Sequence, residues 1–186
     1  MAKKISHVFF AFVILFSYCS FGSIFNTQVK AGAVDTVFTD QLVNTGDNKF
    51  FRPWLPHEQN DQISPSNVYN RSDFTGDLQQ SIYNYFIQYL NPSVTGTYSI
   101  AVTNAVLVKN DLGWDNDTAL FFYENHFNPN DPLQNLLKAN DDIDFENGIY
   151  RSHIPEIELT AGMNYVVVLT SFYPDDTGSV TFTISG

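Results

Sequence analysis

Aspartate side chains are concentrated in one part of the chain, where seven of them fall within 34 residues. They are Asp111, Asp115, Asp117, Asp131, Asp141, Asp142 and Asp144. Closely spaced loop carboxylates suit a hard cation such as Ca²⁺, which takes about six to eight oxygen ligands. The candidate ligands of such a calcium site are Asp115, Asp117, Asp141, Asp142 and Asp144, of which Asp141 and Asp142 are the first choice.

The same residues also have a structural interpretation. Asp and Asn are good turn formers, because their side chains accept hydrogen bonds from nearby backbone N–H groups. The chain has no EF-hand pattern with its Glu at the twelfth position. Asp117, which opens a predicted strand, is the member best suited to a structural role. Both interpretations, a metal site and turn formation, stay open at this stage.

Residues for nucleophilic or zinc-dependent catalysis are sparse. Neither G-x-S-x-G nor H-E-x-x-H occurs. The only cysteine is Cys19, and His126 falls in a loop rich in Asn and Pro. His153 stands where a strand is expected to start, so we interpret it as a packing residue. The sequence predicts no catalytic residues and a protein that is not an enzyme.

Aromatic residues offer a second kind of candidate site, because their rings can stack on sugars or on protein partners. Trp54, Trp114 and Tyr123 are the candidate ligand-binding residues, and Trp114 stands out because it lies among acids in a predicted loop. Aromatic residues at a period of two are also what sandwich cores contain. An exposed row of aromatic residues on one sheet would favour a carbohydrate-binding module.

Strands are the elements that must position these residues. Alternating apolar residues, bounded by Gly, Pro, Asn and Asp, predict an all-β chain folded as an antiparallel β-sandwich. The expected strands are residues 36–43, 81–90, 97–103, 118–123, 154–159, 165–170 and 179–185. The strand 165–170 is apolar on both faces and is expected to be central, whereas 133–139 is ambiguous between a strand and a helical turn.

Two further expectations concern connections. Residues 48–76 contain three prolines and no sustained period, which predicts a long ordered loop or short irregular strands. Its apolar residues are expected to tuck under the core edge, or else to form an exposed aromatic patch; they are Phe50, Phe51, Trp54 and Leu55. Strands 81–90 and 97–103 are expected to be neighbours in one sheet, joined by the turn 91–96.

Residues 1–33 have the features of a secretory signal peptide: Lys3 and Lys4, an apolar run, and the Ala31-Gly32-Ala33 cleavage pattern. An uncleaved membrane anchor and a lipid-modified Cys19 are the alternatives. Removing this segment with its three basic residues leaves 6 Lys and Arg against 20 Asp and Glu, a formal charge of −14. Such an acidic chain is not suited to nucleic acid or to anionic membrane surfaces. We expect a secreted or cell-surface protein with one domain, residues 34–186.

Within that domain, residues 34–79 are read as an N-terminal strand and an irregular loop, and residues 80–186 contain five short motifs in a fixed order. The motifs are GTYSI (96–100), DTALFFY (117–123), ANDD (139–142), LTAGMNYVVV (159–168) and TGSVTF (177–182). Together they resemble the bacterial pre-peptidase C-terminal (PPC) domains. The resemblance implies a jelly-roll-like β-sandwich on secreted or surface proteins, which binds, positions or solubilises rather than catalyses, and some of its members bind calcium.

The chain shows no peptidase part for such a domain to serve, so its client is expected to be a separate extracellular protein or a polysaccharide. The leading hypothesis is therefore a secreted, non-enzymatic binding or accessory domain stabilised by Ca²⁺. A carbohydrate-binding module that uses exposed aromatic residues and a structural matrix protein are the alternatives.

Overall fold

A computed structural model describes residues 27–29, 35–44, 46, 48–60, 62, 64–108 and 116–186, the first three through their backbone alone. These residues form eleven strands and two 3₁₀-helices, η1 (Glu58–Asn60) and η2 (Arg71–Asp73). The strands are β1 (Thr27–Val29), β2 (Thr36–Leu42), β3 (Lys49–Pro53), β4 (Tyr69–Asn70), β5 (Leu78–Pro92), β6 (Gly96–Val108), β7 (Thr118–Glu124), β8 (Leu136–Asn140), β9 (His153–Leu159), β10 (Tyr165–Ser171) and β11 (Thr177–Ser185).

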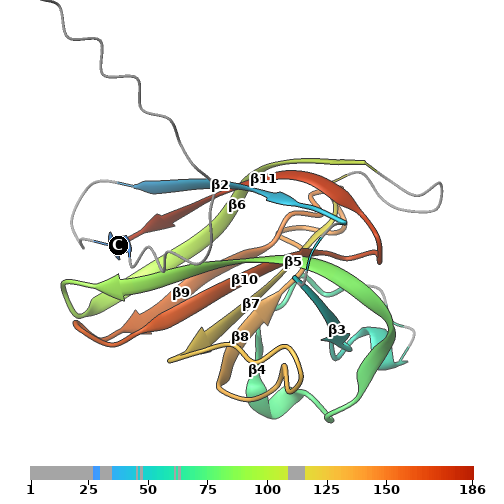
Figure 1. Cartoon of the computed structure of the whole chain (residues 1–186), viewed down its shortest axis with the longest axis horizontal. Coiled ribbons are helices and arrows are strands. Elements are labelled where there is room, and N and C mark those ends of the chain that lie inside the picture. The colour runs from blue at the N-terminus through green and yellow to red at the C-terminus, as the bar shows by residue number, and fades with distance from the viewer. Residues whose placement is uncertain are drawn as a thin grey trace, which may run out of the picture.

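The strands form two sheets that face each other (Figure 1). One sheet has the order β2-β11-β6-β9, and the other β1-β5-β10-β7-β8-β4, with β3 added beside β5. All of these pairs are antiparallel except β1 with β5. Without β1, β3 and β4, the remaining eight strands run 1-8-3-6 against 2-7-4-5, which is the strand order of a jelly roll. The predicted all-β sandwich is therefore confirmed.

The space between the sheets is filled by the inward side chains of both sheets. On β11 the alternating residues Val180, Phe182 and Ile184 are fully buried, as the sequence predicts. The Phe182 ring lies 6.1 Å from that of Phe86 on the facing strand β5. Burying each such side chain contributes roughly 1.5–3 kcal/mol, so this layer is a main source of stability.

Strand β10 is central, as its apolar character on both faces predicts. It pairs with β5 on one side and with β7 on the other, and all seven of its residues are buried. Val167 and Leu169 point into the layer between the sheets, whereas Val166 and Val168 belong to a second core on the opposite face.

The second core exists because residues 48–76 cover the outer face of this sheet. In Figure 1 this segment, with β3 and β4, lies on the side of the sheet away from β2, β11 and β6. Phe50 and Leu55 are buried there, as expected. Trp54 is half-buried. Phe51 keeps 46% of its surface exposed, so the expectation that Phe51 tucks under the core edge is wrong.

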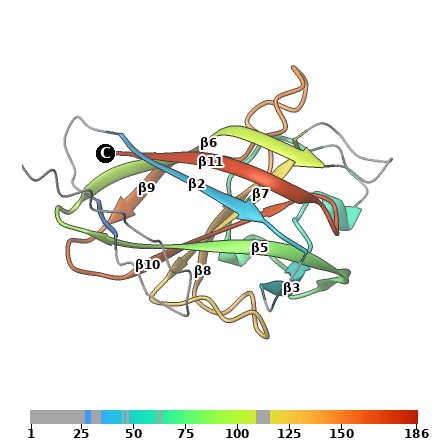
Figure 2. The ribbon, with the colours of Figure 1, turned by 45° about the horizontal axis from the view of Figure 1, so that its top comes forward.

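The expected pairing of residues 81–90 with 97–103 is also wrong. Strands β5 and β6 lie in different sheets, and Figure 2 shows the chain passing from one layer to the other between them. In a jelly roll, most successive strands, though not β7 and β8, cross between the two sheets, so the default preference for a local hairpin does not hold for β5 and β6. The ambiguous stretch 133–139 contributes β8, which is a strand.

The predicted signal segment 1–33 lies outside the described residues apart from β1. Within the described part of the chain, no helix has the length and apolar character needed to cross a membrane.

Candidate functional site

A cavity of about 190 Å³ lies at the end of the sandwich where β7 begins and β8 ends. Its walls contain three carboxylates together with polar and aromatic side chains from distant parts of the sequence. The lining residues are His57, Gln62, Ser64, Asp117, Asp141, Asp142, Phe145 and Phe172. We call this group the carboxylate pocket.

The register of β7 against β8 brings the three aspartates together. Leu120 pairs with Asn140, so Asp117, just before β7, lies near Asp141 and Asp142, just after β8. The side chain of Asn140 fixes the turn after β8. Its Nδ2 donates to the Asp142 carbonyl oxygen at 3.1 Å, and its Oδ1 accepts from the His153 N–H at 2.6 Å.

The segment that covers the sheet completes the pocket. The Nε2 atom of His57 lies 3.3 Å from Oδ2 of Asp141, and Nδ1 of His57 lies 2.9 Å from the Tyr69 hydroxyl oxygen. The Ser64 hydroxyl donates to Asp141 Oδ1 at 3.4 Å, and the Asp142 N–H donates to the same oxygen at 3.1 Å. The pocket is thus shared between residues 48–76 and the sandwich itself.

Each of the three carboxylates keeps one buried oxygen without a hydrogen-bond partner among the described residues. These atoms are Asp117 Oδ1, Asp141 Oδ2 and Asp142 Oδ1. The aspartates are at most 4% exposed. The His57 contact with Asp141 has the distance of an ion pair but not the geometry of a hydrogen bond. Buried polar groups are normally satisfied, so three orphaned carboxylate oxygens in one cavity require an explanation.

Burial changes the acid–base behaviour of the pocket. It raises the pKa of Asp117, the charges of Asp142 and Asp141 act in the same direction, and the resulting pKa is about 9. Burial is also the main cause that raises the pKa values of Asp141 and Asp142 to about 6 each. It lowers the pKa of His57, so its imidazole is neutral at pH 7. The pocket therefore disfavours the negative charge that three aspartates would carry in water.

The nearest buried cation is already paired. The Arg52 guanidinium contacts Glu58 with two hydrogen bonds, Nη1 to Oε2 at 3.0 Å and Nη2 to Oε1 at 2.7 Å. It also lies between the rings of Tyr83 and Phe172, at 4.8 and 5.1 Å from their centroids. Arg52 thus fixes residues 48–76 to the sheet, and the carboxylates of the pocket keep an excess of potential negative charge.

The donor set fits a hard divalent cation. Ca²⁺ prefers carboxylate and carbonyl oxygens, and the pocket has three carboxylates, each with one oxygen that no other described residue satisfies. Within the described ranges, however, no three His, Cys, Asp or Glu side chains already stand as a metal-coordinating group. A cation would therefore need side-chain rotation and further ligands from backbone oxygens or water.

The structure brings together only part of the predicted metal set. Asp117, Asp141 and Asp142 line one cavity, whereas Asp144 does not. The carboxylate of Asp144 accepts hydrogen bonds from the backbone and side chain of Asn147, at 3.2 and 2.7 Å, which is the turn-forming role. Asp115 lies outside the described residues.

Two residues that contact Asp141 in the pocket were not anticipated as members of the site. His57 and Ser64 are more than 50 residues from Asp117 in sequence, and no motif connects them. The structural role expected for Asp117 stays a prediction, because residues 109–115 lie outside the described residues; within the described part of the chain its buried Oδ1 has no hydrogen-bond partner.

The predicted aromatic ligand-binding residues do not form a surface row. Tyr123 is fully buried and its hydroxyl donates to the Pro132 carbonyl at 2.8 Å, so its assignment as a ligand-binding residue is wrong. Side chains alternate between the two faces along β7, and that of Tyr123 lies on the face that belongs to the second core. Trp54 is half-buried and donates to the Leu78 carbonyl, and Trp114 lies outside the described residues. Among the described aromatic residues, only Phe51 is largely exposed.

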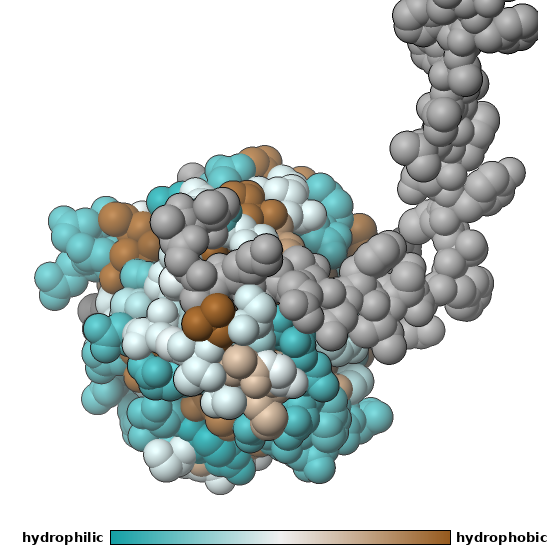
Figure 3. All heavy atoms as spheres, turned by 90° about the vertical axis from the view of Figure 1, so that its left-hand side faces the viewer, coloured by the Kyte–Doolittle hydropathy of each residue, from teal (hydrophilic) through white to brown (hydrophobic). Residues whose placement is uncertain are grey.

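The face shown in Figure 3 agrees with this distribution. Apart from the part under the grey atoms, its hydrophobic side chains form small groups separated by hydrophilic ones.

Comparison with known proteins adds little. No protein-family model matches the chain, and no curated protein matches it. Among solved structures, it is similar to the native structure of a family 35 carbohydrate binding module from Clostridium thermocellum, at 10% sequence identity and a TM-score of 0.31. The match covers 81% of this chain and 98% of that one. A similarity at this level carries no argument about function, and the jelly-roll assignment rests on the strand order.

Proposed function

We propose that this protein is a non-enzymatic binding or accessory domain that acts at or outside the cell surface and is stabilised by a calcium ion in the carboxylate pocket. The observation that carries the proposal is the set of three buried carboxylate oxygens without partners, on Asp117, Asp141 and Asp142. A divalent cation would satisfy these atoms and compensate their charge, which burial alone does not do.

A cation at this place would stabilise the whole domain. Asp117 and Asp141 flank β7 and β8, while His57 and Ser64 belong to the segment that covers the sheet. An ion that binds only when these parts are together favours the folded state by mass action, by about 2.7 kcal/mol at 100 times its dissociation constant. The ion would take the place that a disulfide holds in many extracellular domains.

The size of the pocket supports a structural role. Its volume of about 190 Å³ is below the roughly 300–1,000 Å³ typical of small-molecule sites, so it suits an ion with water better than an organic substrate.

A hydrolase is the alternative that the pocket itself raises, because it joins a serine, a histidine and an aspartate. The hydrogen bonds do not form the required relay, in which the base contacts the nucleophile. The Ser64 hydroxyl donates to Asp141, and His57 faces Asp141 and Tyr69 rather than Ser64. The contacts therefore favour the non-enzymatic role.

The extracellular location and the kinship with PPC domains belong to the same proposal. They are supported by the signal-like segment 1–33 and by the five motifs between residues 96 and 182. The client is proposed to be an extracellular protein or a polysaccharide.

The cation is tested by thermal unfolding of the purified chain in chelator, in Ca²⁺ and in Mg²⁺. We expect Ca²⁺ to raise the melting temperature and chelator to reverse the increase. The double substitution Asp141→Asn with Asp142→Asn should abolish the response to Ca²⁺. The matched control is Asp131→Asn, at an exposed position, which should leave the response unchanged. An unchanged melting temperature at millimolar Ca²⁺ would rule the proposal out.

A further inference from the structure

Another cavity, of about 290 Å³, lies just after β3, where the chain leaves the edge of the sheet. It is lined by Trp54, Glu58, Gln59 and Asp77, and we call it the Trp54 cleft. The carboxylate pocket has a different set of lining residues. The volume lies just below the roughly 300–1,000 Å³ of small-molecule sites, so the cleft suits the end of one long side chain.

Hydrogen bonds hold the Trp54 cleft in shape. The Trp54 N–H donates to the Asp77 carbonyl oxygen at 3.2 Å. The indole Nε1 of Trp54 donates to the Leu78 carbonyl oxygen at 3.1 Å. Both bonds join the chain just after β3 to the start of β5. Because the indole N–H is engaged in this way, Trp54 offers the cleft a ring surface and no further donor.

The charge that the cleft leaves uncompensated is negative. Glu58 is paired, because both of its carboxylate oxygens accept hydrogen bonds from Arg52. Asp77 is exposed, and no basic side chain of the described residues lies within salt-bridge distance of its carboxylate. Its Oδ2 accepts from the Thr75 hydroxyl at 2.8 Å, and that hydroxyl accepts from Gln59 Nε2 at 2.8 Å. Within the described part of the chain, Asp77 Oδ1 and Gln59 Oε1 remain as acceptors.

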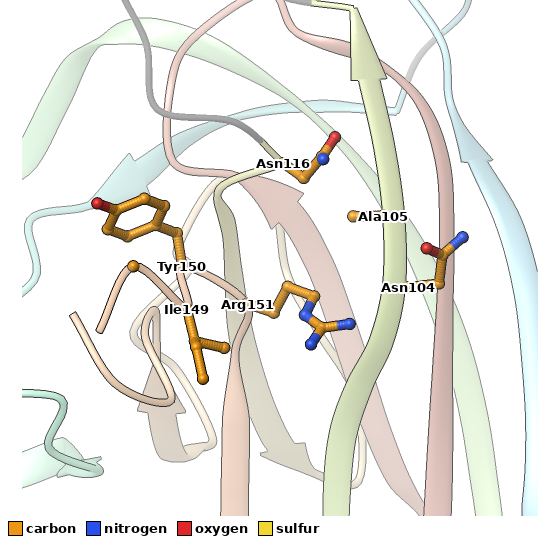
Figure 4. A pocket seen from close by; sticks show the side chains of 7 residues that line it. Asn104, Ala105, Asn116, Ile149, Tyr150 and Arg151 are labelled. Carbon is orange, nitrogen blue, oxygen red and sulfur yellow. The ribbon is translucent and has the colours of Figure 1, made fainter. Parts of the chain in front are cut away.

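An aromatic ring beside carboxylate and amide acceptors suits an organic cation. Among the aromatic residues Trp attracts cations most strongly, and lysine and arginine side chains need acceptors only. The cavity between β6 and the loop before β9 is the opposite case. The charged residue that lines it is Arg151, and its amides belong to Asn104 and Asn116 (Figure 4). A cation is therefore suited to the Trp54 cleft and not to that cavity.

Exposed apolar side chains continue the cleft along β3 and β5. Phe51 on β3 pairs with Ile82 on β5, and Leu78 lies four residues before Ile82 on the same face of β5. These three side chains keep between 36% and 47% of their surface exposed, and we call them the apolar strip. The bond from the Trp54 indole to the Leu78 carbonyl places one end of the strip at the cleft. Contiguous exposed apolar residues of this kind mark interaction sites.

We propose that the Trp54 cleft and the apolar strip bind a protein segment that presents a lysine or arginine next to apolar residues. The cation lies against the Trp54 indole and on the acceptors of Asp77 and Gln59, and the apolar residues lie on the strip. The chain has 20 acidic against 9 basic residues, so its field attracts a basic segment. This names a protein partner for the binding role proposed above, and it rests on that role but not on the calcium ion.

The experiment is an NMR titration of the purified chain, both in Ca²⁺ and in chelator, with three probes. They are a capped Leu-Lys-Leu peptide, a capped Leu-Gln-Leu peptide, and butylammonium. The chain has two tryptophans, Trp54 and Trp114, so the indole signal of Trp54 is assigned by its loss in Trp54→Phe. We expect the lysine peptide to shift this signal and to bind at least about tenfold more tightly than either other probe, because the glutamine peptide lacks the charge and butylammonium lacks the apolar residues.

The decisive variant is Asp77→Asn, which should weaken binding of the lysine peptide about fivefold or more and leave that of the glutamine peptide unchanged. Asp131→Asn is the matched control, since it makes the same change of charge at an exposed position outside the cleft. Ile82→Thr should weaken binding of both peptides about threefold, because it removes apolar surface from the strip. Its matched control is Val106→Thr, at an exposed position on β6.

The natural chain supplies a further measurement if Asp77→Asn lowers the melting temperature. Added sodium chloride should weaken binding of the lysine peptide and leave that of the glutamine peptide unchanged, because salt screens the interaction between exposed charges. Salt-independent binding of the lysine peptide would overturn the proposal.

Each other outcome also bears on the proposal. Saturable binding of the lysine peptide that shifts the Trp54 signal and depends on Asp77 supports it, and the result in chelator separates it from the calcium proposal. Absence of saturable binding in both buffers overturns it, as does equal binding of the glutamine peptide. Equal binding of butylammonium would show a site for small amines and would likewise overturn it. Self-association of the chain that Ile82→Thr abolishes would assign the apolar strip to a second copy instead.

Discussion

The Nε2 atom of His57 lies 3.3 Å from Oδ2 of Asp141. His57 belongs to residues 48–76, the covering segment, and Asp141 directly follows β8. The two residues are 84 positions apart, and both line the carboxylate pocket together with Asp117 and Asp142. Burial among these residues is the main cause that raises the pKa values of the three aspartates. The covering segment therefore determines the chemistry of the pocket.

Asp142→Asn should have opposite effects on stability with and without calcium. In chelator at pH 7.5 we expect an increase in the free energy of unfolding on the order of 1–3 kcal/mol, because the substitution removes a buried charge whose pKa is raised. In Ca²⁺ the variant should lose most of the stabilisation that the cation gives. Urea unfolding in both buffers measures the two effects, and a variant that is less stable than the natural chain in chelator would contradict the prediction.

The stability of the chelated protein should fall as the pH rises. The folded-state pKa of Asp117 is raised from 3.8 to about 9, so the folded chain binds one more proton than the unfolded chain between these values. Stability from this group is complete below pH 3.8 and is lost as the pH rises through about 9. The pKa values of Asp141 and Asp142 are raised only to about 6, and burial lowers the pKa of His57, so most of the decrease between pH 7 and 9 belongs to Asp117.

The control for this pH dependence is Asp117→Asn, which should show a flat profile in chelator between pH 7 and 9. Saturating Ca²⁺ should also remove the decrease, because a bound cation favours the ionised carboxylates. Denaturant unfolding at a series of pH values measures all three profiles. A profile of the natural chain as flat as that of Asp117→Asn would show that Asp117 is already ionised in the folded chain, and would contradict the prediction.

Glu58→Gln should destabilise the domain by about 3–5 kcal/mol, because it leaves the buried guanidinium of Arg52 without its charged partner. Glu58 also accepts from the Leu55 N–H at 2.6 Å, so the start of the covering segment loses a second contact. Glu146→Gln is the control at an exposed position and should change stability by less than about 0.5 kcal/mol. Chemical denaturation followed by circular dichroism compares the two, and equal effects would contradict the role given to the pair.

Gly178→Ala should destabilise the domain by about 2–4 kcal/mol. Gly178 has a φ of 142°, and an added Cβ would lie 2.1 Å from the Val106 carbonyl oxygen on β6. Gly96, at the start of the same partner strand β6, has open space around the position of a Cβ. Gly96→Ala should therefore leave the melting temperature nearly unchanged, and a similar loss in both variants would contradict the steric explanation.

Local sequence patterns predicted most of the strands. The inward positions Val180, Phe182 and Ile184 follow directly from alternation, and the central place of β10 follows from its apolar residues on both faces. These properties depend on neighbouring residues only, because side chains on a strand point alternately to its two faces. Which strands pair could not be predicted from these local patterns, and the expected neighbours β5 and β6 lie in different sheets.

The candidate site shows the same division. The density of aspartates near β7 and β8 is visible in the sequence, and three of them, Asp117, Asp141 and Asp142, line one cavity. It did not separate them from Asp144, which forms a local turn through Asn147. The difference between them is burial, and burial depends on residues far away in the chain.

The sequence by itself thus determined the β-strands, their buried faces and the acidic stretch. The tertiary structure alone decided that residues 48–76 cover one sheet and that His57 and Ser64 join three aspartates in one pocket. The physical reason is that strand formation follows from local alternation, whereas desolvation and charge pairing arise from contacts between residues that are far apart in sequence.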